Sequence, residues 1–207
     1  LIGRACFAPL LLALGRKHPA LAFDLSFSDR RVDLVEEGID LAIRSGPLGD
    51  SAMLSARPLG RQWIGIYAAP GYLAERGRPS GFEELAASAA AHSFVGYARE
   101  GWPHPWRFHD RLGRVAEFEV PARSSFSCDS LEVSAMAAID GAGLARLPTW
   151  LAADALASGA LVRVFEEAQP YGYELNAVWP QARALPQKTR VVIDTLAERL
   201  PPLLALR

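Results

Sequence analysis

The stretch DRRVDLVEEGIDLAIRSGPL, residues 29–48, predicts a helix, a turn, a strand and a loop in succession. Asp29 is a residue type that caps helix N-termini, and Gly38 is a type that ends helices. The segment before it, ALAFDLSFS at 20–28, alternates apolar and polar side chains, which predicts a strand. The apolar IDLAIR at 39–44 predicts a second strand. A short helical crossover between two strands favours parallel pairing.

The same alternation of strands and helices continues to the end of the chain, which indicates the α/β class. A helix at 131–141 is predicted to be capped by Asp129 with Glu132, and a helix at 149–159 by Thr149. The remaining predicted helices are at 4–16, 71–77, 81–89 and 186–204, and the remaining strands at 61–69, 92–98, 114–120, 144–148, 161–165 and 173–180.

The composition of the chain limits the classes of function that it can have. The net charge of −1 over 207 residues leaves no basic footprint for nucleic acid in this chain. Cys6 and Cys128 are too few for a disulfide framework, which favours reduced thiols in a cytoplasmic protein. No apolar run approaches the roughly 20 residues of a membrane span. The apolar segment at the start of the chain has basic residues on both sides, which predicts a helix. The missing initiator Met indicates a fragment.

No motif for catalysis or metal binding is evident. The sequence has no GxSxG, no HExxH and no phosphate-binding glycine loop, and DGAGLARLP at 140–148 lies between a helix and a strand, the reverse of the phosphate-binding order. His104 and His109 lack the spacing of a helical metal pair, and Cys128 lacks a histidine partner. We therefore predict no enzyme activity, no metal and no cofactor.

Arg44 and Ser45 follow a predicted strand, where open α/β sheets bind ligands. A guanidinium there can bind a carboxylate through two parallel hydrogen bonds. The alternative is a surface arginine paired with Asp40 or Glu37. Arg30 also follows a predicted strand. Its side chain is either a ligand contact or solvated.

Tyr97, Trp102 and Trp106 gather in and beside a proline-bearing loop. Aromatic side chains in such a loop either wall a pocket or pack in a core. Packing is the favoured alternative for all three residues, and most strongly for the two tryptophans.

The order of these motifs resembles the effector-binding domain of LysR-type transcriptional regulators, and the resemblance covers essentially the whole chain. The segments that carry it are FAPLLLALGRKHPALAFDLSFSDRRVDLVEEGIDLAIRSGPLGDSAMLSARPLG at 7–60, YLAERGRPSGFEELA at 72–86, PWRF at 105–108, AMAAIDGAGLARLPTWLAADALASGALVRV at 135–164, NAVWP at 176–180 and LPQKTRVVIDTLAERL at 185–200.

The resemblance implies a fold of two Rossmann-like lobes of the periplasmic-binding-protein type, joined by two crossing strands with a ligand cleft between them. Lobe I would comprise 1–68 and 171–207, and lobe II 69–170. The family's first strand would be missing or cut short. In the family a winged helix-turn-helix precedes this domain, and it is absent from this chain.

The resemblance also implies that a small-molecule effector, with carboxylates as one candidate class, binds in the cleft and alters the lobe arrangement and the oligomer geometry to control transcription. The resemblance implies that the full-length protein binds promoter DNA through the absent DNA-binding domain. It also implies that the chain forms a homodimer, and a tetramer at full length. Helices 4–16 and 130–140 are candidates for the dimer seam. The implied ligand-binding residues are Leu1, Ile2, Gly3, Arg30, Arg44, Ser45, Tyr97, Ser127, Cys128 and Asp129.

Two other functions are compatible with such a fold. A solute-binding protein of a transport system would share the lobes and the cleft, and would carry a secretion signal or a lipidated cysteine. An enzyme of the same fold would carry a coherent catalytic set.

Overall fold

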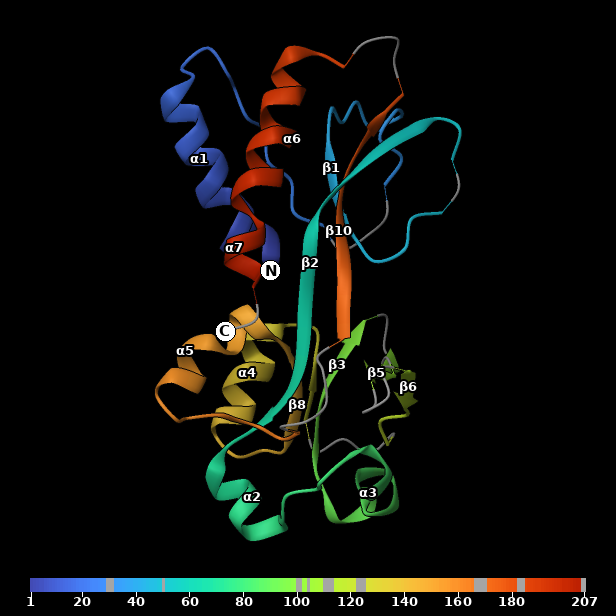
Figure 1. Ribbon diagram of the computed structural model, residues 1–207, viewed down its shortest axis with the longest axis vertical. Helices are drawn as coiled ribbons and strands as arrows, with labels where there is room; N and C mark the ends of the chain where they lie inside the picture. The colour runs from blue at the N-terminus through green and yellow to red at the C-terminus, as the bar shows by residue number, and fades with distance from the viewer. Residues whose placement is uncertain are drawn as a thin grey trace. The chain divides into compact units, whose positions relative to one another are not determined.

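The computed structural model divides the chain into two compact units (Figure 1), Leu1–Gln62 with Tyr173–Ala205 and Trp63–Gly172. Two long strands, β2 (Leu54–Ala68) and β10 (Tyr171–Pro180), each run from one unit into the other. The described residues contain no helix with the length and apolarity needed to cross a membrane. The structure describes residues 1–28, 32–49, 51–99, 102–103, 105–109, 114–121, 126–165, 171–181 and 185–205.

The first unit contains the helices predicted at 4–16 and 186–204. A π-helical segment, η1 (Gly3–Phe7), leads into α1 (Ala8–Lys17), which packs against α6 (Gln187–Arg199). A short helix, α7 (Pro201–Leu204), follows. Apolar side chains at helical spacing are buried on these elements, because one face of each helix turns away from solvent. They are Phe7, Leu10, Leu11, Leu14, Ile193, Leu196 and Leu200.

The sheet of the first unit is antiparallel where parallel pairing was predicted. The predicted strand at 39–44 is observed as β1 (Ala42–Ser45). It pairs with β10, which places Ala42 opposite Val178, and β2 flanks β10 on the other side. Parallel pairing required a strand at 20–28, and the structure has none there.

The segment 21–28 shows why the strand prediction was wrong. Phe23 and Phe27 pack on α1 and η1: a Cβ atom added to Gly15 would lie 3.5 Å from the Phe23 ring, and one added to Gly3 would lie 2.5 Å from the Phe27 ring. Within the described part of the chain, no backbone hydrogen bond involves residues 22–27. Alternation makes one face apolar, but a strand also needs a hydrogen-bonded neighbour.

The helix predicted at 29–37 is a single turn in the part that the structure describes. Asp33 caps this turn, because its Oδ1 accepts hydrogen bonds from the backbone amides of Val35 and Glu36 at 2.8 and 3.2 Å. Leu34 is buried, whereas Val35 is 54% exposed. Gly38 ends the turn at φ +66°, as predicted, and Asp29 lies outside the described residues.

The second unit has a mixed sheet. Strand β8 (Leu144–Pro148) is antiparallel to β2 and parallel to β3 (Phe94–Arg99). Strand β7 (Phe126–Cys128), predicted only as a polar segment, is parallel to β3. The other elements are α2 (Pro70–Arg76), α3 (Phe82–Ala87), η2 (Ala89–Ala91), β4 (Trp102–Pro103), the antiparallel pair β5 (Trp106–His109) and β6 (Val115–Phe118), α4 (Leu131–Ile139), α5 (Thr149–Ala157) and β9 (Val162–Arg163).

Two apolar clusters stabilise this unit. One is aromatic and includes Trp106, which is 3% exposed and lies with its ring centroid 5.6 Å from that of Phe94. The other includes Tyr67, Val95 and Ala138. Trp106 is therefore a core residue, and the side chain of Trp102 lies outside the described part of the structure.

Both predicted helix caps of the second unit were wrong by one residue. Ser130, and not Asp129, caps α4 by accepting a hydrogen bond from the backbone amide of Val133. Thr149 is the first residue of α5, after an N-cap at Pro148. Its buried hydroxyl has no hydrogen-bond partner in the described structure.

The open backbone of residues 22–27 predicts fast hydrogen exchange. We expect their amides to exchange at least about 100-fold faster than those of residues 175–178, which lie in β10 between β1 and β2. Hydrogen–deuterium exchange read by mass spectrometry on peptides from both segments measures the difference. Equal protection of the two segments would show that 22–27 is hydrogen-bonded in solution.

Candidate functional site

Arg44 and Ser45 lie at the carboxyl end of β1, in the first unit. Arg44 is half-buried, and its Nη2 donates a 2.9 Å hydrogen bond to the carbonyl oxygen of Val32. Ser45 is exposed. Asp40 instead accepts a 2.6 Å hydrogen bond from Lys188 Nζ, and the predicted alternative, a pair of Arg44 with Asp40 or Glu37, is not observed among the described residues. The bond to Val32 orients the guanidinium and leaves further N–H donors on it.

Leu1, Ile2 and Gly3 form the entry into η1. The carbonyl oxygen of Leu1 accepts hydrogen bonds from the backbone amides of Arg4 and Ala5 at 3.0 and 3.1 Å. Gly3 leaves room for the Phe27 ring, which any larger residue would displace. This entry is therefore fixed by the backbone, and its half-buried residues present no polar side chain.

The carboxyl ends of two parallel strands, β3 and β7, meet in the second unit. Tyr97 is opposite Cys128, and Gly96 is opposite Ser127. Tyr97 and Cys128 are half-buried, whereas Ser127 and Asp129 are exposed. Parallel strands end at the same edge of their sheet, so these side chains occupy the edge at which α/β sheets bind ligands.

A small polar network lies behind this edge, at the start of α4. The Sγ atom of Cys128 lies 3.2 Å from the carbonyl oxygen of Ser130 and 3.3 Å from the Oγ atom of Ser134. Ser134 Oγ in turn donates to the carbonyl oxygen of Ser130 at 3.1 Å. The network fixes Cys128 against the helix, and both serine hydroxyls are already used, because Ser134 Oγ donates to Ser130 and Ser130 Oγ donates to Glu132 Oε2 at 2.9 Å.

Sequence reasoning missed Ser130 and Ser134. Their spacing of four residues at the start of a helix is the signal that could have found them, because a serine four residues into a helix commonly bonds back to a carbonyl of the preceding turn. The structure brings Tyr97, Ser127, Cys128 and Asp129 together in one unit, and Arg44 and Ser45 together in the other. Arg30 lies outside the described residues.

The described residues hold no cluster of three or more His, Cys, Asp or Glu side chains suited to a metal ion. Of the two thiols, Cys6 is buried in η1, and burial raises the pKa of its thiol. Cys128 is half-buried.

Comparison with known proteins identifies the family. The family model described as the LysR substrate binding domain matches residues 1–201. The chain belongs to this family. The regulator CrgA of Neisseria meningitidis serogroup C is 30% identical over 194 residues, which cover 93% of this chain and 62% of CrgA. The regulator DmlR of Escherichia coli K12 is 32% identical over 203 residues, 95% of this chain and 61% of DmlR.

Solved structures of LysR regulatory domains have the same fold. The regulatory domain of CrgA from Neisseria meningitidis matches with a TM-score of 0.75 and 28% identity, over 96% of this chain and 94% of that one. The regulatory domain of AphB from Vibrio vulnificus matches with a TM-score of 0.76 and 23% identity, over 94% and 92%. These matches confirm the α/β class and the two-lobed periplasmic-binding-protein type of fold.

Membership in the LysR family confirms the predicted regulatory domain and disfavours a transport protein. The chain spans about 62% of the length of the curated relatives that it matches.

The two cysteines are expected to differ in reactivity. Cys128 is half-buried, whereas Cys6 is 6% exposed with a raised thiol pKa, and only the thiolate reacts with maleimides. We expect maleimide to label Cys128 of the folded protein before it labels Cys6. The substitution Cys128→Ser should therefore remove the faster labelling. Mass spectrometry of timed samples measures this, with unfolded protein, in which both thiols react, as the control. Initial labelling at Cys6 would contradict the expectation.

Proposed function

We propose that this chain is the effector-sensing domain of a bacterial LysR-type DNA-binding transcriptional regulator that acts in the cytoplasm and carries out no bond-making reaction. The observation that carries the proposal is the family match over residues 1–201. Promoter DNA would be bound by an N-terminal winged helix-turn-helix outside this sequence.

The proposed effector is a small anionic molecule, with a carboxylate favoured by Arg44. Among the described residues its guanidinium donates one hydrogen bond, to the carbonyl oxygen of Val32, and a planar guanidinium suits a carboxylate. Ser45 adds a hydroxyl beside it. The other proposed contacts are Leu1, Ile2, Gly3 and Arg30 on the first unit, and Tyr97, Ser127, Cys128 and Asp129 on the second.

The proposed mechanism is a shift between conformations of the domain. An effector shifts such an equilibrium only by its difference in affinity for the two states. Arg44 lies at the end of β1 and Cys128 at the end of β7, so each side chain is positioned by the strand pairing of its own unit.

The proposed oligomer is a homodimer in which α1 of one copy packs on α4 of another. On α4, Met136 is 67% exposed, and Val133 and Ile139 lie one turn before and after it on the same face and are also exposed. On α1, Leu12 is 62% exposed, in line with the exposed residues Ala5 and Pro9. Exposed apolar stripes of this kind indicate contact surfaces.

Charge favours pairing α1 with α4 over pairing either helix with itself. The first and last turns of η1 and α1 carry Arg4 and Arg16, and no acidic residue occurs between Leu1 and Lys17. Helix α4 carries Glu132 in its first turn and is followed by Asp140, with no basic residue. Complementary charge contributes to partner choice and orientation.

Arg44 tests the effector proposal. In a thermal shift screen against aromatic and aliphatic carboxylates, a ligand at 100 times its Kd should raise the melting temperature by roughly 5–10 °C. We expect Arg44→Lys to lose most of this rise, because an ammonium cannot make two parallel bonds to a carboxylate. Arg61→Lys is the matched control, since Arg61 is an exposed arginine of the same unit paired with Glu174. A rise that survives Arg44→Lys would remove Arg44 as the anchor.

Met136 and Arg16 test the proposed dimer. We expect the protein to sediment as a dimer and Met136→Glu to shift it toward monomer by at least about tenfold in Kd, because a buried charge at an apolar contact is costly. Arg16→Glu should weaken the dimer, and Glu132→Arg in the same chain should restore it in part. Sedimentation velocity over a concentration series measures these changes. A monomer at all concentrations, or a dimer indifferent to Met136→Glu, would contradict this seam.

A further inference from the structure

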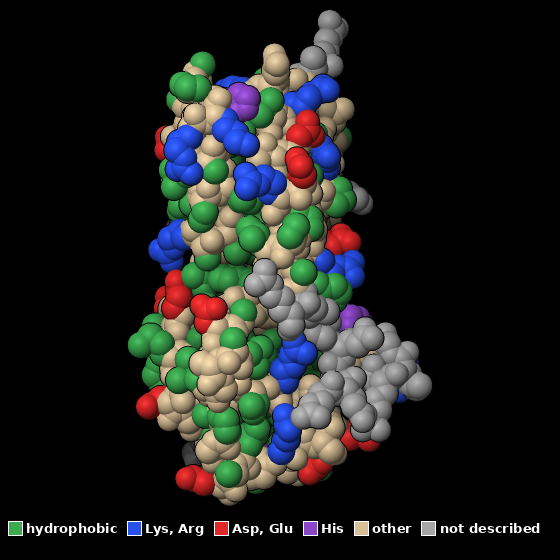
Figure 2. Space-filling view, turned by 60° about the vertical axis from the view of Figure 1, so that its left-hand side comes forward, with side chains coloured by type: hydrophobic (Ala, Val, Ile, Leu, Met, Phe, Trp, Pro, Cys, Tyr) green, Lys and Arg blue, Asp and Glu red, His purple; other side chains and the backbone are tan. Residues whose placement is uncertain are grey.

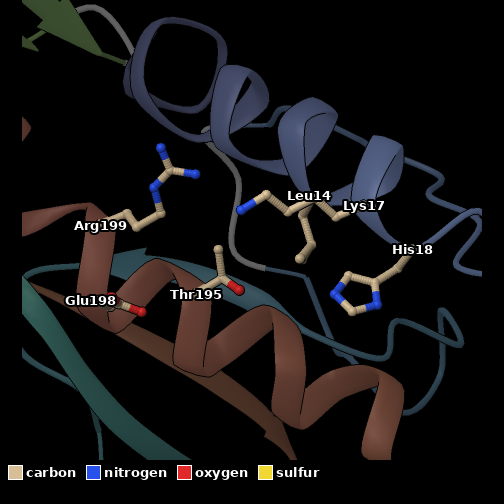
Figure 3. Close-up of a pocket in the computed structure, with 6 residues that line it drawn as sticks. All are labelled: Leu14, Lys17, His18, Thr195, Glu198 and Arg199. Carbon is tan, nitrogen blue, oxygen red and sulfur yellow. The ribbon is translucent and has the colours of Figure 1, made fainter.

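An open groove of about 340 Å³ lies between α1 and α6 in the first unit. Its lining comes from the last turn of each helix and the residue after α1 (Figure 3). Figure 2 shows Lys and Arg side chains gathered around a histidine on the face of this unit. The lining residues are Leu14, Lys17, His18, Thr195, Glu198 and Arg199.

Lys17 and Arg199 extend into this groove from opposite helices (Figure 3). Neither has a hydrogen bond or ion pair with another described residue. Three other exposed cations of the same unit do: Arg57 pairs with Asp194, Arg61 with Glu174 at 3.2 Å, and Lys188 with Asp40 at 2.6 Å. Arg16 and Arg190 are exposed outside the groove and likewise form no ion pair with a described residue. Lys17 and Arg199 therefore line one groove, which also contains Glu198, and neither of them forms an ion pair within the described part of the chain.

Helix dipoles explain part of this arrangement. Lys17 is the last residue of α1 and Arg199 the last of α6, where a cation interacts favourably with the exposed carbonyls. That effect accounts for a basic residue at each helix end. It does not account for both side chains lining one groove, since like charges that approach each other repel.

The rest of the lining defines what the groove can accept. Glu198 is its single carboxylate, so the three charged side chains sum to +1. His18 adds a ring N–H donor, and Leu14 contributes an apolar wall. Thr195 Oγ1 already donates to the carbonyl oxygen of Val191 at 2.8 Å, so it is not a free donor.

We propose that the groove binds a small oxyanion of the phosphate class, held between Lys17 and Arg199. An arginine fork matches two oxygens of such a group, and a lysine adds a point charge. The site is independent of the proposed effector contacts, because Arg44 does not line it. A free inorganic anion and the phosphate group of a nucleotide share this chemistry.

Inorganic pyrophosphate is the first probe, measured on the whole chain at constant ionic strength with chloride as the balancing anion. We expect calorimetric binding, and a melting temperature raised by about 3 °C at ten times the Kd. Lys17→Gln and Arg199→Gln should each weaken binding about tenfold, and Arg199→Lys should restore part of it. Arg190→Gln is the matched control, because Arg190 is exposed on α6 but does not line the groove, and it should change the Kd by less than twofold.

Glu198→Gln should change the affinity for pyrophosphate in the opposite direction. Removing the carboxylate should tighten pyrophosphate binding several-fold, whereas a variant that merely perturbed α6 would not. Stronger binding of ADP than of pyrophosphate would identify a nucleotide as the source of the anion, and weaker binding would identify the free anion. No binding above the chloride control, or equal losses in Arg190→Gln and Arg199→Gln, would overturn the proposal.

Discussion

A β-strand forms only where a neighbouring strand satisfies its backbone hydrogen bonds, and this constraint sets both the sheets and the candidate sites of the chain. Strands β2 and β10 satisfy it along most of their length, and each passes from one unit into the other. Strand β1 is ordered by β10, and β7 is ordered by β3. Residues 22–27 have the side-chain pattern of a strand but no neighbouring strand in the described structure, and Phe23 and Phe27 pack on α1 and η1.

The same constraint positions the residues with the chemistry for ligand binding. Arg44 and Ser45 are the last two residues of β1, and their register against Asn176 and Leu175 of β10 fixes where the strand ends. Cys128 ends β7 opposite Tyr97. Side chains at strand ends are anchored by a rigid ladder on one side and followed by a loop or helix on the other, which combines a fixed position with access to a ligand.

The sequence predicted most helices and strands because their hydrophobic spacing is a local property. Leu10 and Leu14 on α1, and Leu196 on α6, needed no knowledge of the partner to be recognised as one buried face. The errors fall where the outcome depends on distant residues or on competing caps. Strand β7 has exposed residues at 126 and 127 and exists because β3 lies beside it. Asp129 and Ser130 are both good caps, and the one-residue difference between them is beyond what spacing decides.

The candidate site was predictable only in part, for a related reason. Strand ends could be placed from the sequence, so the position of Arg44 and Ser45 at the end of a strand was predicted, but their side-chain partners were not. The bond from Arg44 to Val32 and the network of Cys128 with Ser130 and Ser134 depend on the fold of the loops around them. The net charge of the chain also fails to show where charges are grouped. The sum of −1 over the whole chain conceals a first unit in which some cations are paired with carboxylates while Lys17 and Arg199 share a groove with one carboxylate. Charges act over distances comparable to the Debye length of about 10 Å, so their local grouping, and not their sum, determines which anions the surface attracts.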